Sequence, residues 1–403
     1  MDWWEGWREA ASTSLGFFWK AGWAFVLGYA ISGMIQAFVP KSRLTRHMGD
    51  AGPRSVTLAT VFGAASSSCS FAALAAARSL VLKGAHFVAA VAFMFASTNL
   101  VIELGVLILI FLGWQFLAAE IVGGLLLIVI SATLIRLTYP RSWMRAARDQ
   151  VEEQASAEED DFDWKERIRH RYGWQLVGHK FVMDWKMVWE EIAIGFTVAG
   201  FIAVLVPASF WARIFLIDAG GSLPGWLVVL ENAVVAPLVA AATFIGSMGN
   251  IPLATVLNAN GILFAGIMGF IYSDLMVPPL VAINAKYYGR RVALYIAGVM
   301  WVSIVITAIV LHALFEAFGA VPESRRAVHE TTRLAVDYTF WLNLAMVVVA
   351  AVMIRLHRAH VRDEDGRPAA GAGSGRPGVK RIVVLVMLAI VLTGLVGRLL
   401  ASV

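Results

Sequence analysis

The sequence predicts an all-α, polytopic helical membrane protein with about nine to ten membrane spans and two re-entrant or broken hairpins arranged in inverted repeats. Its apolar composition, its recurrent apolar windows and an internal duplication carry this prediction. Hydrophobic residues make up 59% of the chain and charged residues only 15%, with a mean hydropathy of +0.72. Windows of about 20 apolar residues recur, and each can cross the roughly 30 Å hydrocarbon layer. Soluble domains do not have this composition.

Nine segments are candidate spans, and two linkers divide them. The candidate spans are residues 15–39, 85–112, 114–137, 187–207, 226–246, 262–285, 292–315, 336–355 and 381–400. Residues 1–14 are rich in tryptophan and predict an interfacial segment. The polar linker 139–186 separates a first transmembrane repeat, 15–138, from a second one, 187–315. Residues 316–403 predict C-terminal transmembrane helices joined by a flexible Gly- and Pro-rich linker at 360–380.

Two shorter segments, 56–82 and 247–260, are apolar but contain small and polar residues that interrupt a helix. Non-helical backbone at membrane depth is tolerated only where protein covers it or where it lines a cavity. If 56–82 enters and leaves on one side, 26 of the 33 Lys and Arg residues fall on one face of the membrane. Because basic loops stay in the cytoplasm, this placement predicts a re-entrant path for 56–82 and a cytoplasmic linker at 139–186.

Short sequence matches that occur in the same order in both halves indicate the internal duplication. Residues 28–40 (GYAISGMIQAFVP) match 195–207 (GFTVAGFIAVLVP) at an offset of 167, and Gly84 matches Gly261 at an offset of 177. The charge placement starts the first half outside and the second half inside, which predicts inverted repeats as in many secondary transporters. The two interrupted segments then correspond to each other, and such a pair is the best sequence pointer to a transport site.

The first hairpin gathers four serines and the only cysteine of the chain within five positions. These residues are Ser66, Ser67, Ser68, Cys69 and Ser70. Their hydroxyls and the exposed amides of helix ends are suited to bind a substrate. The alternative is that the small side chains only let helices pack closely. For Cys69 the alternatives are a soft ligand for a metal or metalloid and inert packing.

Polar residues in other segments complete the candidate site. The predicted substrate-lining residues are Ser97, Thr98 and Asn99 after the first hairpin, and Ser247 and Asn250 in the second. An ionisable group inside a span is costly and usually faces a cavity or a partner. We therefore predict Asp274 and Glu103 as coupling carboxylates, with Asp274 favoured because the offset of 177 places it opposite Ser97. Glu120 and Glu231 are further candidates. The alternative for Glu103 and Glu120 is pairing with neighbouring groups, and the alternative for Glu231 is exposure to water near an interface.

The sequence excludes several classes of function. It contains no Walker loop, zincin pair or nucleophile elbow, so no cofactor is expected and transport energy would come from a gradient or a partner. One cysteine excludes a disulfide scaffold and a multi-thiolate cage, and no metal site is predicted. The net charge of +5 comes from loops between spans and does not indicate nucleic-acid binding.

Three classes of function remain. The favoured one is a secondary permease that moves a small molecule or an ion across the lipid bilayer. The second is a passive channel or the membrane subunit of a larger complex. The third is an intramembrane enzyme with Cys69 or a serine as nucleophile, although neither hairpin contains a histidine to serve as its base. Assembly into a homo-oligomer is compatible with each.

The segment SSSCSFAALAAARSLVLKGAHFVAAVAFMFASTNLVIELG resembles the signature of the YraQ/ArsP-like group of bacterial permeases, as does IGSMGNIPLATVLNANGILFAGIMGFIYSDL in the second half. The resemblance implies a multi-pass permease of the bacterial plasma (inner) membrane. It also implies efflux of a metal, a metalloid or an organoarsenical, because some members export trivalent organoarsenicals. The motif of the family often has Cys-x-Cys followed by proline. Here Ser67 replaces the first cysteine and Cys69 keeps the second, so capture by two thiols cannot occur within this motif.

Overall fold

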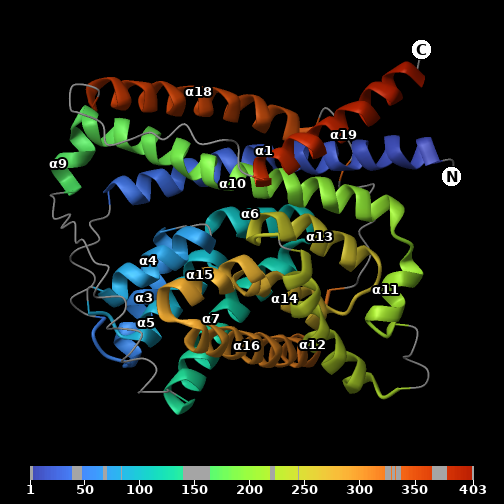
Figure 1. Ribbon diagram of the computed structural model, residues 1–403, viewed down its shortest axis with the longest axis horizontal. Helices are drawn as coiled ribbons and strands as arrows, with labels where there is room; N and C mark the ends of the chain where they lie inside the picture. Colours follow the sequence, from blue (N-terminus) through green and yellow to red (C-terminus); the bar gives the residue numbers. More distant parts are fainter. Residues whose placement is uncertain are drawn as a thin grey trace.

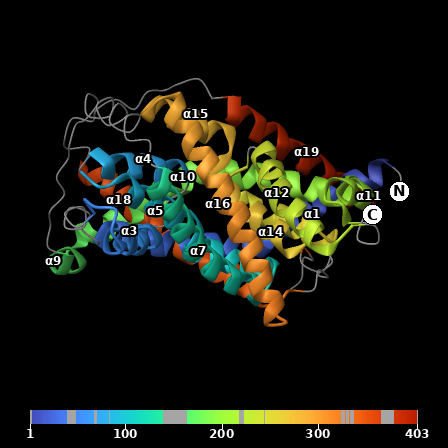
Figure 2. The ribbon, with the colours of Figure 1, turned by 90° about the horizontal axis from the view of Figure 1, so that it is seen from below.

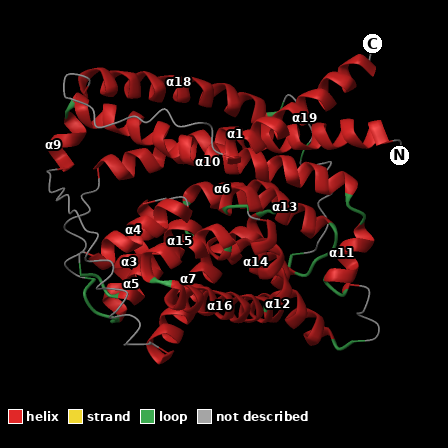
Figure 3. Ribbon diagram, in the orientation of Figure 1, coloured by secondary structure: helices red, strands yellow, loops and turns green. Residues whose placement is uncertain are grey.

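The computed structural model describes residues 3–38, 48–66, 70–82, 84–138, 164–217, 223–243, 245–322, 328, 332, 337–364 and 379–401. Every regular element in these ranges is a helix (Figure 3). Six helices are long and apolar enough to cross a membrane, and the number rises to eight if each of two bent pairs is one span. The structure therefore confirms an all-α polytopic membrane protein, whereas the count of nine to ten spans stays a prediction.

The six long helices are α1 (Trp3–Phe38), α7 (Trp114–Thr138), α10 (Arg171–Leu205), α12 (Gly225–Thr243), α16 (Arg290–Ala317) and α18 (Tyr338–Glu364). α1 runs without a break from Trp3, so the expected interfacial segment 1–14 continues into the first span. α10 begins at Arg171, inside the expected linker 139–186, and residues 139–163 of that linker lie outside the described residues. Figure 1 shows α1, α10 and α18 as a layer of long helices on one side of the molecule.

Two segments that were expected to be continuous spans are bent in the structure. Segment 85–112 contains α5 (Phe87–Asn99) and α6 (Ile102–Phe111), with an angle of 43° between them. Segment 262–285 contains α14 (Phe264–Ile271), the 3₁₀ helix η2 (Tyr272–Met276) and α15 (Pro278–Tyr288), with a bend of 41°. At the second bend the residue before Pro278 is extended, because a proline disfavours the helical conformation of its predecessor.

The shorter helices are α3 (Pro53–Ser66), α4 (Ser70–Leu82), α9 (Trp164–Arg169), α11 (Ala208–Ile214), α13 (Ser247–Ala259) and α19 (Val379–Ala401). α3 and α4 form the first interrupted segment, 56–82, and α13 corresponds to the second, 247–260, which follows α12. Ser67, Ser68 and Cys69 lie between α3 and α4, outside the described residues. Figure 2 shows α16 between α7 and α12.

Helix boundaries in the two halves coincide at the offsets found in the sequence. At the offset of 177, the end of α3 coincides with that of α12, both ends of α4 with those of α13, and the start of α5 with that of α14. The ends of α1 and α10 coincide at the offset of 167. Glycines with positive φ recur at corresponding turns, at Gly84 (93°) and Gly261 (85°) and again at Gly113 (103°) and Gly289 (83°). Other residues rarely adopt this conformation, so the same turn chemistry appears twice.

The two halves contact each other through equivalent helices that run antiparallel. Ser14 near the start of α1 packs against Gly200 near the end of α10, whereas Val177 near the start of α10 packs against Gly33 near the end of α1. α7 and α16 are also antiparallel, since Gly123 lies against Leu311 and the Thr138 and Tyr295 hydroxyls are 2.8 Å apart. In addition, α4 packs on α15 and its counterpart α13 packs on α6, the counterpart of α15.

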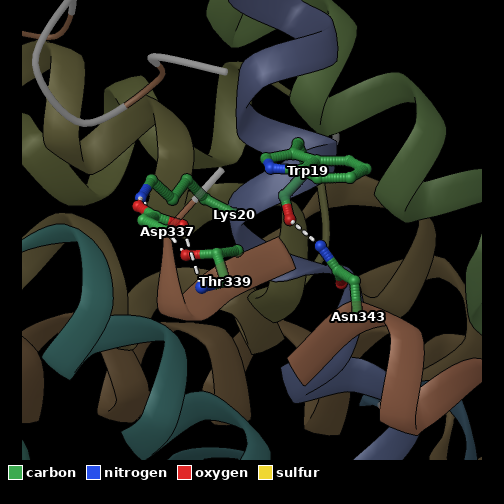
Figure 4. A network of polar contacts seen from close by, with 5 residues as sticks. All are labelled: Trp19, Lys20, Asp337, Thr339 and Asn343. Carbon is green, nitrogen blue, oxygen red and sulfur yellow. Dashed lines mark hydrogen bonds and ion pairs between the residues drawn. The ribbon is translucent and has the colours of Figure 1, made fainter. Parts of the chain in front are cut away.

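α18 and α19 follow the second half and pack on α1 and α10. The start of α18 is tied to α1 by a polar network (Figure 4). Lys20 Nζ donates to Asp337 Oδ2 at 2.8 Å and to Thr339 Oγ1 at 3.2 Å. Asp337 Oδ1 also accepts from the Thr339 N–H at 2.8 Å, and Asn343 donates to the Trp19 carbonyl at 2.8 Å. These contacts set the depth at which α18 lies along α1.

We expect Asp337→Asn to weaken the anchoring of α18 only where the carboxylate is ionised. The hydrogen bond from Lys20, followed by those from Thr339, holds the pKa of Asp337 below its usual range. The stabilisation by the ion pair is therefore present above about pH 4 and is lost as the pH falls through the lowered pKa. It should amount to at most about 1 kcal/mol, because the pair is partly open to solvent. Thermal unfolding of the purified variant and wild type at a series of pH values measures this difference, and a constant difference down to pH 2 would contradict the ion-pair explanation.

Candidate functional site

The two interrupted segments place the N-termini of α4 and α13 inside the molecule. α4 begins at Ser70, which is 2% exposed, and α13 begins at Ser247, which is 7% exposed. The residue before α13, Gly246, is extended and forms no side-chain cap. The first N–H groups of a helix have no partner within the helix, and they carry the positive end of its dipole. Each break thus brings hydrogen-bond donors into the interior of the protein.

Asp274 joins the second half to the first break. It lies in η2, is completely buried, and its Oδ2 accepts a hydrogen bond of 2.8 Å from Ser70 Oγ. Its Oδ1 has no hydrogen-bond partner among the described residues. Ser70 and Asp274 were each predicted from sequence, and the structure brings them into contact across 204 positions of the chain. This contact is the centre of the candidate site.

Ser97, Thr98 and Asn99 are buried at the end of α5, where the bend follows. Their side chains bond to their own helix: Ser97 Oγ donates to the Met94 carbonyl at 3.0 Å, and Asn99 Nδ2 donates to the Phe95 carbonyl at 3.2 Å. Such local bonds compete with the helix ladder, and they coincide with the end of α5. In the part of the chain that the structure describes, Asn99 Oδ1 has no hydrogen-bond partner.

Asn250 is the fully buried polar residue of the second break. Its side-chain nitrogen and oxygen both lack a hydrogen-bond partner within the described ranges. It sits in the first turn of α13, one turn after Gly246, and side chains on a helix lean back toward the helix N-terminus. Its amide therefore extends toward the break. An unpaired buried amide is costly, which indicates a place for a polar ligand or for water.

Glu120 adds a second buried carboxyl close to Asp274. It is 1% exposed, neither of its oxygens has a hydrogen-bond partner among the described residues, and it interacts electrostatically with Asp274. Tyr272 donates a hydrogen bond of 3.0 Å to the Ala119 carbonyl beside it. A Cβ at Gly123 would overlap the Tyr272 hydroxyl. Sequence reasoning missed Tyr272, although it stands two positions before Asp274.

The other predicted carboxylates lie elsewhere. Glu103 is buried between α6 and α1, where a Cβ at Gly28 would overlap its side chain. Glu231 in α12 accepts a hydrogen bond of 3.0 Å from Asn232. Ser66 ends α3 at the edge of the first break. Ser67, Ser68 and Cys69 fall in the gap between the described ranges, so their predicted lining role stays a prediction.

Among the described residues, the buried carboxylates are not matched by buried lysine or arginine side chains. Buried acidic side chains are Glu103, Glu120, Asp184 and Asp274, whereas no lysine or arginine in the described ranges is buried. Asp184, in the first half of α10, has its own partners, since Gln36 and Ser32 donate to it. No group of three or more His, Cys, Asp or Glu side chains in these ranges is placed to hold a metal ion. The described part of the centre is therefore acidic and polar.

Comparison with known families matches residues 6–313 to the ArsP_1 family, described as "Predicted permease". This match covers both halves and leaves out α18 and α19. The chain belongs to this permease family. It is similar to "Putative permease Rv2963" of Mycobacterium tuberculosis (39% identity over 328 residues, 78% of this chain and 79% of that protein). It is also similar to "UPF0718 protein YraQ" of Escherichia coli (25% identity over 298 residues, 73% and 78%). The comparison with solved structures finds no match.

We expect Ser70→Ala to destabilise the permease because it leaves Asp274 Oδ2 buried without its donor. Loss of such a donor costs about 1 to 3 kcal/mol, which should lower the melting temperature of the purified protein in detergent. Thr133→Ala is the matched control, since this exposed hydroxyl only bonds to a carbonyl of its own helix. Equal and small effects of the two substitutions would contradict the importance of the Ser70–Asp274 contact.

A second prediction concerns the packing of α10 on α13. A Cβ at Gly195 would overlap the Gly249 backbone. Alanine in place of glycine favours a helix by about 1 kcal/mol, yet Gly195→Ala should lower the melting temperature because backbone cannot move aside cheaply. Gly298→Ala in α16 is the control, since a Cβ there meets no atom within 4 Å. A stabilised Gly195→Ala protein would show that the two helices do not touch at this point.

Proposed function

We propose that the protein is a secondary permease that exports a small solute across the bacterial plasma membrane by alternating access. The transport site would lie where the breaks before α4 and α13 meet Asp274. The hydrogen bond between Ser70 and Asp274 carries this proposal, because it joins an interrupted segment of the first half to the buried acid of the second. A site at the junction of two repeats is typical of secondary transporters.

The antiparallel pairing of equivalent helices supports the inverted arrangement. α1 and α10 occupy corresponding places in the two halves, and they run in opposite directions along each other. If both cross the membrane, one enters from outside and the other from inside. The same holds for α7 and α16. If α3 with α4 and α12 with α13 form re-entrant hairpins, and each bent pair is one span, each half crosses the membrane three times, and an odd number is what inversion requires. Rocking of one half against the other would then expose the site alternately to each face.

Asp274 is the proposed coupling carboxylate, with Glu103 as a second candidate. The proposed lining of the substrate path consists of Ser66, Ser67, Ser68, Cys69, Ser70, Ser97, Thr98, Asn99, Ser247 and Asn250. A buried carboxyl such as that of Asp274 can take up a proton or a cation. Coupling to the proton gradient agrees with the absence of an ATP-binding motif in the sequence.

The proposed solutes are of the metal, metalloid or organoarsenical class, with the linker 139–186 in the cytoplasm. The family membership supports a permease, and the placement of basic residues supports the orientation. The hydroxyl-rich first break offers only one thiol, so its contacts to a metalloid would come from Cys69 and neighbouring serines rather than from a thiol pair.

Export can be tested in a host that lacks its own arsenic efflux pumps. We expect cells expressing the permease to accumulate less of at least one of arsenite, methylarsenite, antimonite or a divalent metal. Asp274→Asn should abolish this difference, and Asp337→Asn, which changes a carboxylate outside the proposed site, serves as the expression control. In everted vesicles a protonophore should stop uptake of the same solute. Uptake that continues unchanged would overturn proton coupling and favour a passive channel.

A further inference from the structure

The long helix α18 is held near its two ends. Its buried side chains, among those that the structure describes, are Thr339, Met353 and His360. Thr339 belongs to the network that ties the start of α18 to Lys20 of α1. Met353 and His360 lie toward the other end, where α18 packs on α10 (Figure 1). Because α1 belongs to the first half and α10 to the second, α18 joins the two halves.

Three histidines meet where the end of α18 packs on α10. Between ring centroids, His179 of α10 lies 5.2 Å from His357 and 4.6 Å from His360, both of α18. Tyr172 packs on His360 at 5.6 Å. The helix backbones are also close, since a Cβ at Gly178 would overlap the α18 backbone at His357. We call His179, His357 and His360 the histidine cluster.

The helix segments that meet at the histidine cluster are basic. Residues 166–186 and 353–363 contain eight lysines and arginines and three acidic residues. Lys186 of α10 and Arg358 of α18 act electrostatically on His357. The acidic residues are Glu166 in α9, Asp184, which accepts a hydrogen bond of 2.6 Å from Gln36, and Asp363, which accepts one of 2.8 Å from Gln175. A positive charge on the cluster would therefore add to an existing excess of positive charge.

The two ends of α18 respond to different ranges of pH. Histidine is the side chain that gains its charge between about pH 8 and pH 5. Neutral imidazole rings pack like other aromatic side chains, whereas two imidazolium ions would place like charges about 5 Å apart, which opposes the contact. The ion pair of Lys20 and Asp337 does not change in this range, because the pKa of Asp337 lies below its usual range.

We propose that the histidine cluster is a pH-sensitive contact, which holds the end of α18 on α10 when its rings are neutral and releases it when they are protonated. The start of α18 stays bound to α1, so that α18 pivots about the ion pair of Lys20 and Asp337. Release removes one link between the two halves. The match to the ArsP_1 family ends at residue 313, so this device lies partly outside the matched region. It depends neither on the identity of the solute nor on the proposed transport site.

Distances between spin labels in the purified full chain in detergent test this inference. Cys69→Ser removes the native cysteine. Met183→Cys in α10 is then combined either with Val361→Cys near the end of α18 or with Leu344→Cys near its start. These three side chains are exposed, so each position can carry a label. Between pH 8 and pH 5.5 we expect the distance from 183 to 361 to increase and that from 183 to 344 to stay the same.

Variants of the cluster show whether the histidines cause the change. His357→Phe combined with His360→Phe keeps aromatic rings in place and removes two titrating groups, so it should lose most of the increase. His360→Lys should give the longer distance already at pH 8, since it introduces a fixed positive charge. His312→Phe is the matched control, because His312 lies in α16, outside the cluster, and it should keep the full response.

The labelled chain with an intact cluster decides the matter even if a cluster variant fails to fold. A distance from 183 to 361 that is the same at pH 8 and pH 5.5 would overturn the proposal. An equal increase for residue 344 would also overturn it, since α18 would then leave as a whole. A full response in the double phenylalanine variant would show that another group titrates. None of these outcomes bears on export through Asp274, which the accumulation assay tests separately.

Discussion

The structure depends on one constraint, that backbone which leaves the helix inside a membrane must be covered by protein. Four interruptions lie within apolar segments, before α4, before α6, before α13 and before α15. Each frees N–H or C=O groups that lipid cannot satisfy. The long helices α1, α10, α7, α16 and α12 lie around these interruptions, so that the breaks gather inside (Figures 1 and 2). The outer helices therefore shield the interrupted inner helices from lipid. The inner helices supply the polar groups of the candidate site.

Glycines at the helix contacts allow these helices to pack closely. A Cβ at Gly63 of α3 would overlap the Phe93 carbonyl of α5, and one at Gly195 would overlap the backbone of α13. Small residues at helix contacts let backbones approach closely, which replaces the hydrophobic driving force that is missing in lipid. The same close approach sets Glu191 of α10 against Gly246 at the start of α13. Packing and site geometry thus come from the same residues.

Much of this arrangement can be predicted from the sequence. The rest cannot, because it depends on local hydrogen bonds and tertiary contacts that a hydropathy pattern does not show. The broken segments 56–82 and 247–260 and the buried Asp274 stand out because polar and small residues are costly inside apolar windows. The bends after Asn99 and before Pro278 were missed, since hydropathy is averaged over the length of a whole span and hides a short interruption. Pro278 was a readable signal for the second bend, whereas the first depends on side chains that bond to their own helix. The Ser70–Asp274 contact and the position of Glu191 depend on tertiary packing between distant segments, which no local pattern encodes.

The two halves share the arrangement of their helices but differ in their polar side chains. At the offset of 177, Ser70 corresponds to Ser247, but Asp274 corresponds to Ser97, which bonds to its own helix. The buried acid of the proposed site therefore comes from the second half, and the first half contributes Ser70 at a helix N-terminus. In the proposed alternating-access cycle, the repeated backbone would give two conformations of similar energy, one open to each side, because exchanging the halves leaves the packing nearly unchanged. Asp274 would then pass from one face to the other as the conformation changes, so that one buried acid rather than two would serve each transport cycle.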